Sequence, residues 1–156
     1  MDHRSGTIAA GTEGLGTHVL TRISNSVEET EQIAAEIAQT LRGGECIALY
    51  GELGAGKTQF VRGLVRGLGG NPRAVSSPTF VLLNTYDGGR LKVFHLDAYR
   101  IGGVADFETI GFAEMLEQGG VVVVEWPGKI EKLLPGNRVN VKISARSELT
   151  RVFEIK

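Results

Sequence analysis

The residues with the clearest chemical role in this chain form a phosphate-binding loop pattern, Gly-x-x-x-x-Gly-Lys-Thr, at residues 51–58. Its glycines let backbone N–H groups converge on phosphate oxygens, because glycine accepts unusual φ values and leaves room for close approach. Lys57 can reach the β and γ phosphates, and the Thr58 hydroxyl can ligate Mg²⁺ at the start of a helix whose dipole favours anions. The pattern predicts a nucleoside triphosphate site made of Gly51, Glu52, Leu53, Gly54, Ala55, Gly56, Lys57, Thr58 and the following Gln59.

The segments on either side of this loop have the form that the motif requires. The apolar run Cys46–Tyr50 before it predicts a buried strand, and residues 59–68 after it predict a helix. The alternative is a glycine-rich turn that matches the motif by chance, and such a turn would not need a strand before it and a helix after it. Cys46 is the only cysteine, so it cannot form an internal disulfide, and its apolar surroundings favour an inert core thiol.

Two acidic residues, Glu125 and Asp97, follow predicted strands, and either can hold magnesium directly or through water. Four valines precede Glu125, a run typical of a strand buried on both faces, and ligands bind at the carboxyl ends of such strands in open α/β sheets. The alternatives are a solvated acid at Glu125 and an ordinary cap at Asp97. His95 lies on the same strand face as Asp97, and a hydrogen-bonded structural role is favoured over proton transfer because no nucleophile lies beside it in the sequence.

The remaining periodicity predicts an α/β fold in which strands alternate with helices. Ser24 or Ser26 can cap a helix that Gly43 and Gly44 end. Turn residues then separate the later elements, and the last two strands should close the sheet edge as a hairpin. The predicted elements are a helix over 27–41, an antiparallel hairpin of 80–86 and 90–96, a helix over 106–118, and strands over 121–124, 138–143 and 151–155.

Length and composition predict one domain, residues 23–156, after a flexible N-terminal tail, residues 1–22. A hydrophobic content of 42% is enough for a core, and a net charge of −1 provides no general attraction to polyanions. No apolar run approaches the roughly 18 residues needed to span a bilayer, and the N-terminus lacks the features of a signal peptide. These features predict a cytoplasmic protein with no membrane contact.

Four motifs occur in order along the chain: the loop at 51–58, Ser77-Pro78-Thr79-Phe80, His95-Leu96-Asp97-Ala98-Tyr99-Arg100, and Glu125-Trp126-Pro127. Together they closely resemble the bacterial TsaE (YjeE-type) ATPases, and the resemblance runs from about residue 24 to the C-terminus. It implies a P-loop NTPase-like three-layer fold, with a mixed sheet that has a parallel core and added antiparallel strands. The implied ligands are ATP and Mg²⁺.

The resemblance also implies a role in tRNA modification. TsaE-like ATPases act with the TsaB and TsaD proteins, which install threonylcarbamoyl on adenosine 37 of tRNAs reading ANN codons. Their ATP hydrolysis is thought to support turnover of the TsaB–TsaD complex, so tRNA would be reached indirectly through that complex. Direct contact would need a local basic patch, for which Arg62, Arg66 and Arg73 are the only modest cluster.

Carried over by position, the resemblance assigns Lys57 and Thr58 to the phosphates and Mg²⁺, with Glu125 as the metal-site glutamate and Asp97 as the acid of the H-x-D-x-Y-R segment. The expected catalytic residues are therefore Lys57, Asp97 and Glu125. The segment Ser77, Pro78 and Thr79 resembles a switch-like loop that senses the γ phosphate; its structural alternative is a turn that enters a strand. Tyr99 and Arg100 can report nucleotide state to a partner, or can simply pack and carry a solvated charge.

The base pocket and the reaction class remain open at this point. No Asn-Lys-x-Asp guanine-reading motif is present, and adenine could pack near Ser26 and Trp126, although Trp126 could equally be a core or lid aromatic. Gln59 stands where many relatives have a threonine. A small-molecule kinase would use the same loop but usually needs an arginine-bearing lid. Residues 98–118 contain a single arginine, Arg100, which argues against such a lid. A nucleotide-dependent binding module with negligible turnover is the other alternative.

Overall fold

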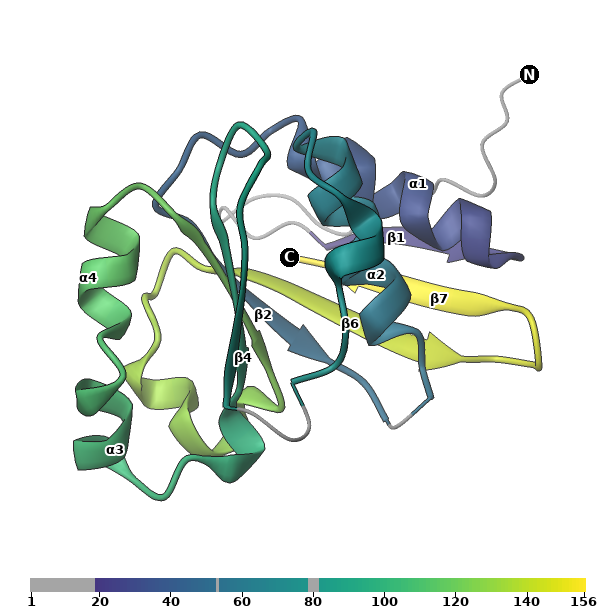
Figure 1. Cartoon of the computed structure of the whole chain (residues 1–156). Helices are drawn as coiled ribbons and strands as arrows, with labels where there is room; N and C mark the ends of the chain where they lie inside the picture. Colours follow the sequence, from purple (N-terminus) through teal and green to yellow (C-terminus); the bar gives the residue numbers. More distant parts are fainter. Residues whose placement is uncertain (1–18, 53, 79–81) are drawn as a thin grey trace.

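The computed structural model describes residues 19–52, 54–78 and 82–156, and Figure 1 draws the remainder as a grey trace. Helices and strands alternate through most of this range. The strands are β1 (Leu20–Ser24), β2 (Cys46–Tyr50), β3 (Leu83–Tyr86), β4 (Val93–Asp97), β5 (Val121–Glu125), β6 (Val139–Ala145) and β7 (Arg151–Ile155). The α-helices are α1 (Val27–Ala38), α2 (Lys57–Gly67), α3 (Val104–Thr109) and α4 (Phe112–Glu117), and the 3₁₀ segments are η1 (Pro72–Ala74), η2 (Ala98–Arg100) and η3 (Pro127–Leu133).

The described strands form one seven-stranded mixed sheet in the order β1-β7-β6-β2-β5-β4-β3. Its centre is parallel, because β2 pairs in parallel with β5 and β6, and β5 pairs in parallel with β4. The β3–β4, β6–β7 and β1–β7 pairs are antiparallel. Parallel pairing brings the carboxyl ends of β2, β4 and β5 to the same edge, where Asp97 is in register with Glu125. The prediction of a P-loop α/β fold with a mixed sheet is confirmed.

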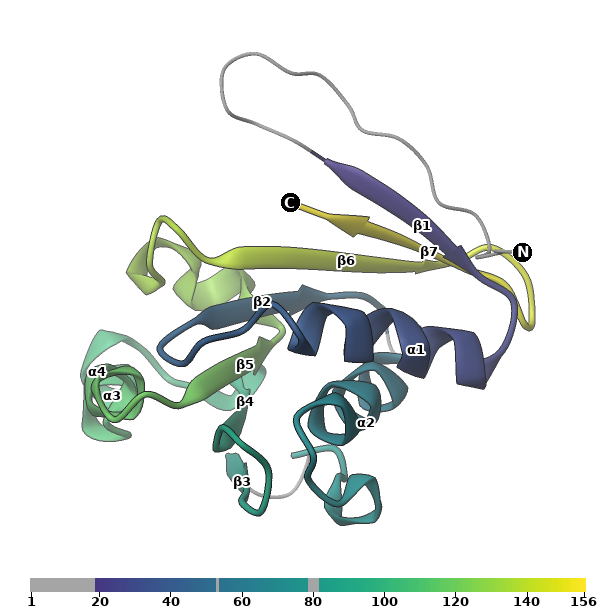
Figure 2. The ribbon, with the colours of Figure 1, turned by 90° about the horizontal axis from the view of Figure 1, so that it is seen from above.

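Helices cover both faces of the sheet, as the view in Figure 2 shows. In β5, Val121 and Val123 belong to a core with α1 and α2, whereas Val122 and Val124 pack in a second core with α3 and α4. All five residues of β5 are buried. Burial on both faces explains why this strand is a continuous run of valines rather than an alternating pattern. Two cores on either side of one sheet make the three layers that were expected.

The N-terminal part differs from the sequence-based expectation. Residues 20–22 lie in β1, not in the tail expected to extend to residue 22; residues 1–18 of that expected tail lie outside the described residues. Because β1 pairs with β7, the hairpin of β6 and β7 does not close the sheet edge as expected, and β1 is the edge strand. β7 lies between β1 and β6 in the sheet. Its alternation of polar and apolar residues could not predict this, because alternation does not distinguish an inner strand from an edge strand.

The helices also end earlier or break where the sequence predicted continuity. The helix predicted over 106–118 is two short helices, because Gly111 has φ 81°, a left-handed conformation that ends α3 and begins α4. The helix predicted to reach residue 41 ends at Ala38, with Gln39 as its C-cap, before Gly43 and Gly44.

The start of α1 follows the predicted capping. Ser26 is the N-cap, and its hydroxyl accepts the Glu29 N–H at 3.0 Å. Ser24 is instead buried at the end of β1, where its hydroxyl contacts Thr30 at 2.8 Å. Within the described residues, none of the helices is long and apolar enough to cross a membrane.

Candidate functional site

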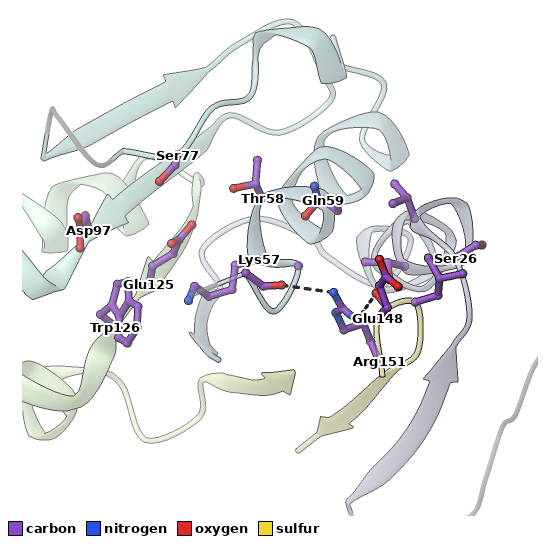
Figure 3. Close-up of a pocket in the computed structure, with 15 residues that line it drawn as sticks. Ser26, Lys57, Thr58, Gln59, Ser77, Asp97, Glu125, Trp126, Glu148 and Arg151 are labelled. Carbon is purple, nitrogen blue, oxygen red and sulfur yellow. Dashed lines mark hydrogen bonds between the residues drawn. The ribbon is translucent and has the colours of Figure 1, made fainter. Parts of the chain in front are cut away.

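A pocket of about 460 Å³ lies over the β2–α2 loop and the carboxyl ends of β4 and β5 (Figure 3). The start of α1 and the β6–β7 turn close its other end. It collects side chains from segments that are far apart in the sequence. Its lining residues are Ser26, Val27, Thr30, Gly54, Gly56, Lys57, Thr58, Gln59, Ser77, Asp97, Glu125, Trp126, Glu148, Leu149 and Arg151.

The loop between β2 and α2 has the backbone of a phosphate cradle. Gly54 has φ 82° and Gly56 has φ 111°, conformations that residues with a Cβ rarely adopt. Gly56 is the N-cap of α2 and carries no side chain that could cap the first turn. The amide N–H groups at the start of α2 therefore suit an anion, with the helix dipole adding to the attraction. Leu53, which the sequence placed in the cradle, lies outside the described residues.

Lys57 is the first residue of α2 and is only 7% exposed. Its ammonium donates to the carbonyl oxygens of Gly51 at 2.5 Å and Glu52 at 3.3 Å, and it lies 4.0 Å from the centre of the Trp126 ring. Burial lowers the pKa of Lys57, while the nearby charges of Glu125, Glu52 and Asp97 act in the opposite direction. The cation is thus held inside the loop, where phosphate oxygens would be stronger acceptors than carbonyls.

The structure brings the two predicted acids together on adjacent strands. Asp97 is 8% exposed and Glu125 is 4% exposed, and both line the same pocket as Thr58. Burial raises the pKa of Asp97, and the Glu125 charge raises it further, although the Tyr99 N–H bonded to Oδ1 at 3.0 Å opposes this. Two neighbouring buried carboxylates favour a cation between them and the phosphates.

Magnesium usually takes few protein ligands and completes its shell with water and phosphate oxygens. Within the described ranges, no three His, Cys, Asp or Glu side chains cluster closely enough to hold a metal ion by themselves. Thr58, Asp97 and Glu125 instead offer one hydroxyl and two carboxylates around the same space. This donor set fits a hard cation that is bound together with phosphate.

His95 was predicted to be a hydrogen-bonded structural residue and Cys46 an inert core thiol, and both are buried in the structure. His95 is fully buried, with Nε2 2.5 Å from Glu125 Oε2 and Nδ1 3.0 Å from the Tyr86 hydroxyl. Cys46 is 2% exposed, and burial raises the pKa of its thiol to about 12, which keeps it protonated and unreactive.

The two residues expected near a base do not lie together. Trp126 lies beside Lys57 and Glu125, whereas Ser26 lies at the far end of the pocket near Glu148 and Arg151 (Figure 3). Both residues nevertheless line the same pocket, so the expectation that adenine packs near them stays a prediction. The cradle lies between the two ends: Lys57 is 4.0 Å from the centre of the Trp126 ring, and Arg151, near Ser26, donates to the Ala55 carbonyl at 2.8 Å. Trp126 has φ 55°, a strained conformation for a residue with a side chain, which can mark a functional position.

The expected switch and partner-sensing residues are placed as follows. Ser77 lines the pocket and faces it in Figure 3, Pro78 is buried, and Thr79 lies outside the described residues. Tyr99 is 64% exposed, and its ring centre lies 6.0 Å from that of Trp126. Arg100 is exposed at the end of η2. Tyr99 thus contacts the pocket residue Trp126 and is also exposed on the molecular surface.

Arg151 is a pocket residue that the sequence did not single out. Its Nε donates to the Ala55 carbonyl at 2.8 Å, and its Nη2 lies 3.3 Å from the Gly54 carbonyl. Its Nη1 donates to carbonyls of the β6–β7 turn, including that of Glu148. Arg151 thus ties the Gly54 and Ala55 carbonyls of the loop to the β6–β7 turn. Val27, Thr30, Glu148 and Leu149 are further lining residues without a sequence signal.

We expect Arg151→Met to weaken nucleotide binding about tenfold, because the loop loses two charge-assisted hydrogen bonds while the side-chain stem is kept. Titration calorimetry with ADP measures the effect. Arg146→Met is the matched control, since Arg146 is exposed and does not line the pocket. An unchanged Kd in Arg151→Met would show that the loop does not need this tether.

Asp97→Asn is expected to stabilise the ligand-free protein at neutral pH. The folded-state pKa of Asp97 is raised, so between its ordinary pKa and the raised one the folded state binds more protons than the unfolded state. The wild type therefore loses stability as pH rises through that window, and Asn avoids this loss. Urea unfolding between pH 4 and 7.5 should show an advantage for Asp97→Asn that shrinks as pH falls. Asp87→Asn, in the exposed β3–β4 turn, is the control; a pH-independent difference for Asp97→Asn would contradict the assignment.

Comparison with known proteins gives one consistent result. Residues 24–153 match the model of the family described as Threonylcarbamoyl adenosine biosynthesis protein TsaE. The chain is similar to tRNA threonylcarbamoyladenosine biosynthesis protein TsaE of Treponema pallidum, with 36% identity over 133 residues, 85% of this chain and 97% of that protein. The protein of the same name from Bacillus subtilis is 40% identical over 116 residues, which cover 74% of this chain and 72% of that protein.

Solved structures agree with the sequence comparisons. The crystal structure of Bacillus subtilis YdiB superposes with a TM-score of 0.71 at 31% sequence identity. The match covers 88% of this chain and 84% of that one.

Proposed function

Because this chain belongs to the TsaE family of threonylcarbamoyl adenosine biosynthesis proteins, we propose that it is a Mg²⁺-dependent ATPase of tRNA threonylcarbamoyladenosine synthesis. One observation carries the proposal: the phosphate cradle with Lys57 faces two buried carboxylates, Asp97 and Glu125, across a single pocket. A cradle alone would support binding, but acids at the ends of two adjacent strands add the groups that a metal-dependent hydrolysis needs.

The side chains have separable tasks in this proposal. Lys57 neutralises negative charge that develops on the phosphates, and the N–H groups at the start of α2 orient them. Thr58, Asp97 and Glu125 hold the cation and its water; bound Mg²⁺ supplies charge neutralisation at the phosphate oxygens. None of the described side chains in the pocket is an obvious general base, so positioning and electrostatics account for the chemistry.

We further propose that hydrolysis supports turnover of a TsaB–TsaD complex that modifies adenosine 37 of tRNAs reading ANN codons. Tyr99 and Arg100 are candidates for transmitting nucleotide state, because both are exposed directly beyond Asp97. tRNA is reached through the complex rather than by this chain. The net charge of −1 supports this view, and two members of the modest basic cluster have partners: Arg62 lies 3.5 Å from the Val75 carbonyl, and Arg66 lies 4.0 Å from Glu31.

The test is ATP hydrolysis by the purified protein, alone and with the matching TsaB and TsaD proteins, with possible small-molecule acceptors scanned in parallel. ADP formation that increases with the partners and needs Lys57 supports the proposal. Transfer of phosphate to a small acceptor without partners would make the protein a kinase. Tight ATP binding without turnover under any of these conditions would make it a nucleotide-dependent binding module.

Thr58→Ala is expected to impair the metal-dependent step more than nucleotide binding itself. The hydroxyl lies at the start of α2, so its loss removes one metal ligand while the cradle is kept. Hydrolysis measured across Mg²⁺ concentrations should fall and need more metal, while ADP affinity in EDTA should change little. Thr58→Ser, which keeps the hydroxyl, should retain activity; a wild-type magnesium dependence in Thr58→Ala would contradict the assignment.

A further inference from the structure

A series of hydrogen bonds, buried at Glu125 and His95 and partly buried at Ser76, connects Glu125 with the segment that precedes β3. His95 Nε2 lies 2.5 Å from Glu125 Oε2, and His95 Nδ1 lies 3.0 Å from the Tyr86 hydroxyl. The Tyr86 hydroxyl donates to the Ser76 carbonyl at 2.9 Å, and the Ser76 N–H lies 3.3 Å from the same hydroxyl. Ser76 directly precedes Ser77, which lines the pocket. The series therefore begins at a pocket residue, Glu125, and ends at Ser76, the neighbour of the pocket residue Ser77.

Every side chain of this connection is nearly inaccessible to solvent. His95 is 0% exposed, Glu125 4% and Tyr86 5%. Buried polar groups are costly unless they are paired, and apolar side chains at positions 86 and 95 would fill the same core without that requirement. On the face of β4 that carries His95, the residue two positions earlier is Val93, which is buried in the same core as Tyr86. Packing alone therefore does not explain why Tyr86 and His95 are polar. A role in holding Glu125 and Ser76, to which they are hydrogen-bonded, does explain it.

The geometry determines what the connection does to Glu125. An N–H of His95 donates to Oε2, so this oxygen is held from behind and the other carboxylate oxygen remains for the pocket. On the other side, the Ser76 carbonyl accepts from Tyr86 at 2.9 Å and from the Asn84 amide at 3.2 Å. Both ends are therefore fixed by directional bonds, and a displacement at one end alters the bonding at the other.

We propose that Tyr86 and His95 are positioning residues that orient the Glu125 carboxylate and couple it to segment 76–78. This inference rests on the proposed function and deepens it. A ligand phosphate that reaches Ser77 then also sets the carboxylate that faces the metal, so nucleotide state is sensed at both places together. Residues that orient metal ligands from behind commonly change affinity or activity by about 10–100-fold when they are replaced.

The first experiment compares Tyr86→Phe with wild type in ATP hydrolysis. This variant removes only the hydroxyl and keeps the ring in the core, so the fold should be retained. We expect kcat to fall about tenfold, while KM and ADP affinity change less than about twofold. Tyr50→Phe is the matched control, because it removes another strand hydroxyl, one that donates to Glu131 and has no part in this connection. Wild-type kcat in Tyr86→Phe would overturn the proposal.

A conservative pair at position 95 provides the second comparison. His95→Gln keeps an N–H that can donate to Glu125, whereas His95→Leu keeps only bulk. We expect His95→Gln to retain more activity than His95→Leu at similar thermal stability. Equal activities in the two variants would mean that His95 only fills space, and would overturn its positioning role.

A measurement that does not depend on turnover separates this inference from the proposed function. Histidine-selective ¹⁵N NMR is suitable because the chain has three histidines, and His95 is assigned by comparison with His95→Gln. We expect ADP with Mg²⁺ to shift the His95 signals in the wild type and to shift them less in Tyr86→Phe. If the wild type binds nucleotide without hydrolysing it, the ATPase proposal fails while these shifts still decide the coupling. Nucleotide binding without a His95 shift would overturn the coupling, and no nucleotide binding at all would overturn both.

Discussion

Lys57→Ala is expected to reduce ATP hydrolysis by at least about a hundredfold and to weaken nucleotide binding in parallel. Removing one preorganised electrostatic group from a transition state commonly costs about 2.7–4 kcal/mol, or 10²–10³ in rate. Lys57 is buried at the centre of the cradle, and its present acceptors are the backbone oxygens of Gly51 and Glu52. Steady-state hydrolysis and ADP titration measure the two losses.

This loss should occur without unfolding. Burial lowers the pKa of Lys57, which means that the buried charge is unfavourable to the ligand-free fold, so its removal should cost little stability. Lys142→Ala is the control, because Lys142 is exposed on β6 and lies outside this pocket. If Lys57→Ala hydrolysed ATP normally, the site assignment itself would be wrong.

Gly63→Ala should be the most damaging small substitution in the fold. Glycine inside a helix is ordinarily improved by alanine, by about 0.5–1 kcal/mol. At Gly63, however, an added Cβ would lie 2.3 Å from the Glu31 carbonyl oxygen and 2.5 Å from Glu31 Cα, which belong to the backbone of α1. Backbone atoms cannot rotate away as a side chain can, so α1 and α2 would have to separate.

We expect a loss of about 3 kcal/mol in the free energy of unfolding, at the upper end of typical overpacking costs. For a chain of this size the melting temperature would fall by roughly 6–12 °C. Urea and thermal unfolding measure the change. Arg66→Ala, at an exposed position of the same helix, tests for a general effect of alanine and should be nearly neutral. A stabilised Gly63→Ala would mean that the two helices are not in this close contact.

Residues that act within a short stretch of chain were predictable. The cradle at 51–58 requires only a strand, eight consecutive residues and a helix, so its pattern is complete in the sequence. The valine run of β5 and the Ser26 cap of α1 are equally local. Glu125 and Asp97 could be proposed separately because each ends a recognisable strand, and strand ends of parallel sheets meet at one edge.

Residues that act across the sheet were not predictable in the same way. Arg151 reaches the cradle from β7, nearly a hundred residues further along the chain, and the edge strand β1 depends on pairing with that same β7. Alternation shows on which face a side chain lies but not which strand is its neighbour. The helix break at Gly111 was missed because a glycine can be tolerated within a helix or can end it, and only its φ of 81° distinguishes the two.

By itself, therefore, the sequence determined the fold class, the phosphate cradle and the identity of the acids, since each is a pattern of neighbouring residues governed by local sterics and periodicity. Only the tertiary structure decided that Asp97 and Glu125 are paired, that Ser26 and Trp126 lie apart, and that Tyr86 and His95 stand behind Glu125. These relations depend on strand order and close packing between distant segments. Both arise from the burial of the whole chain, which no local window of sequence contains.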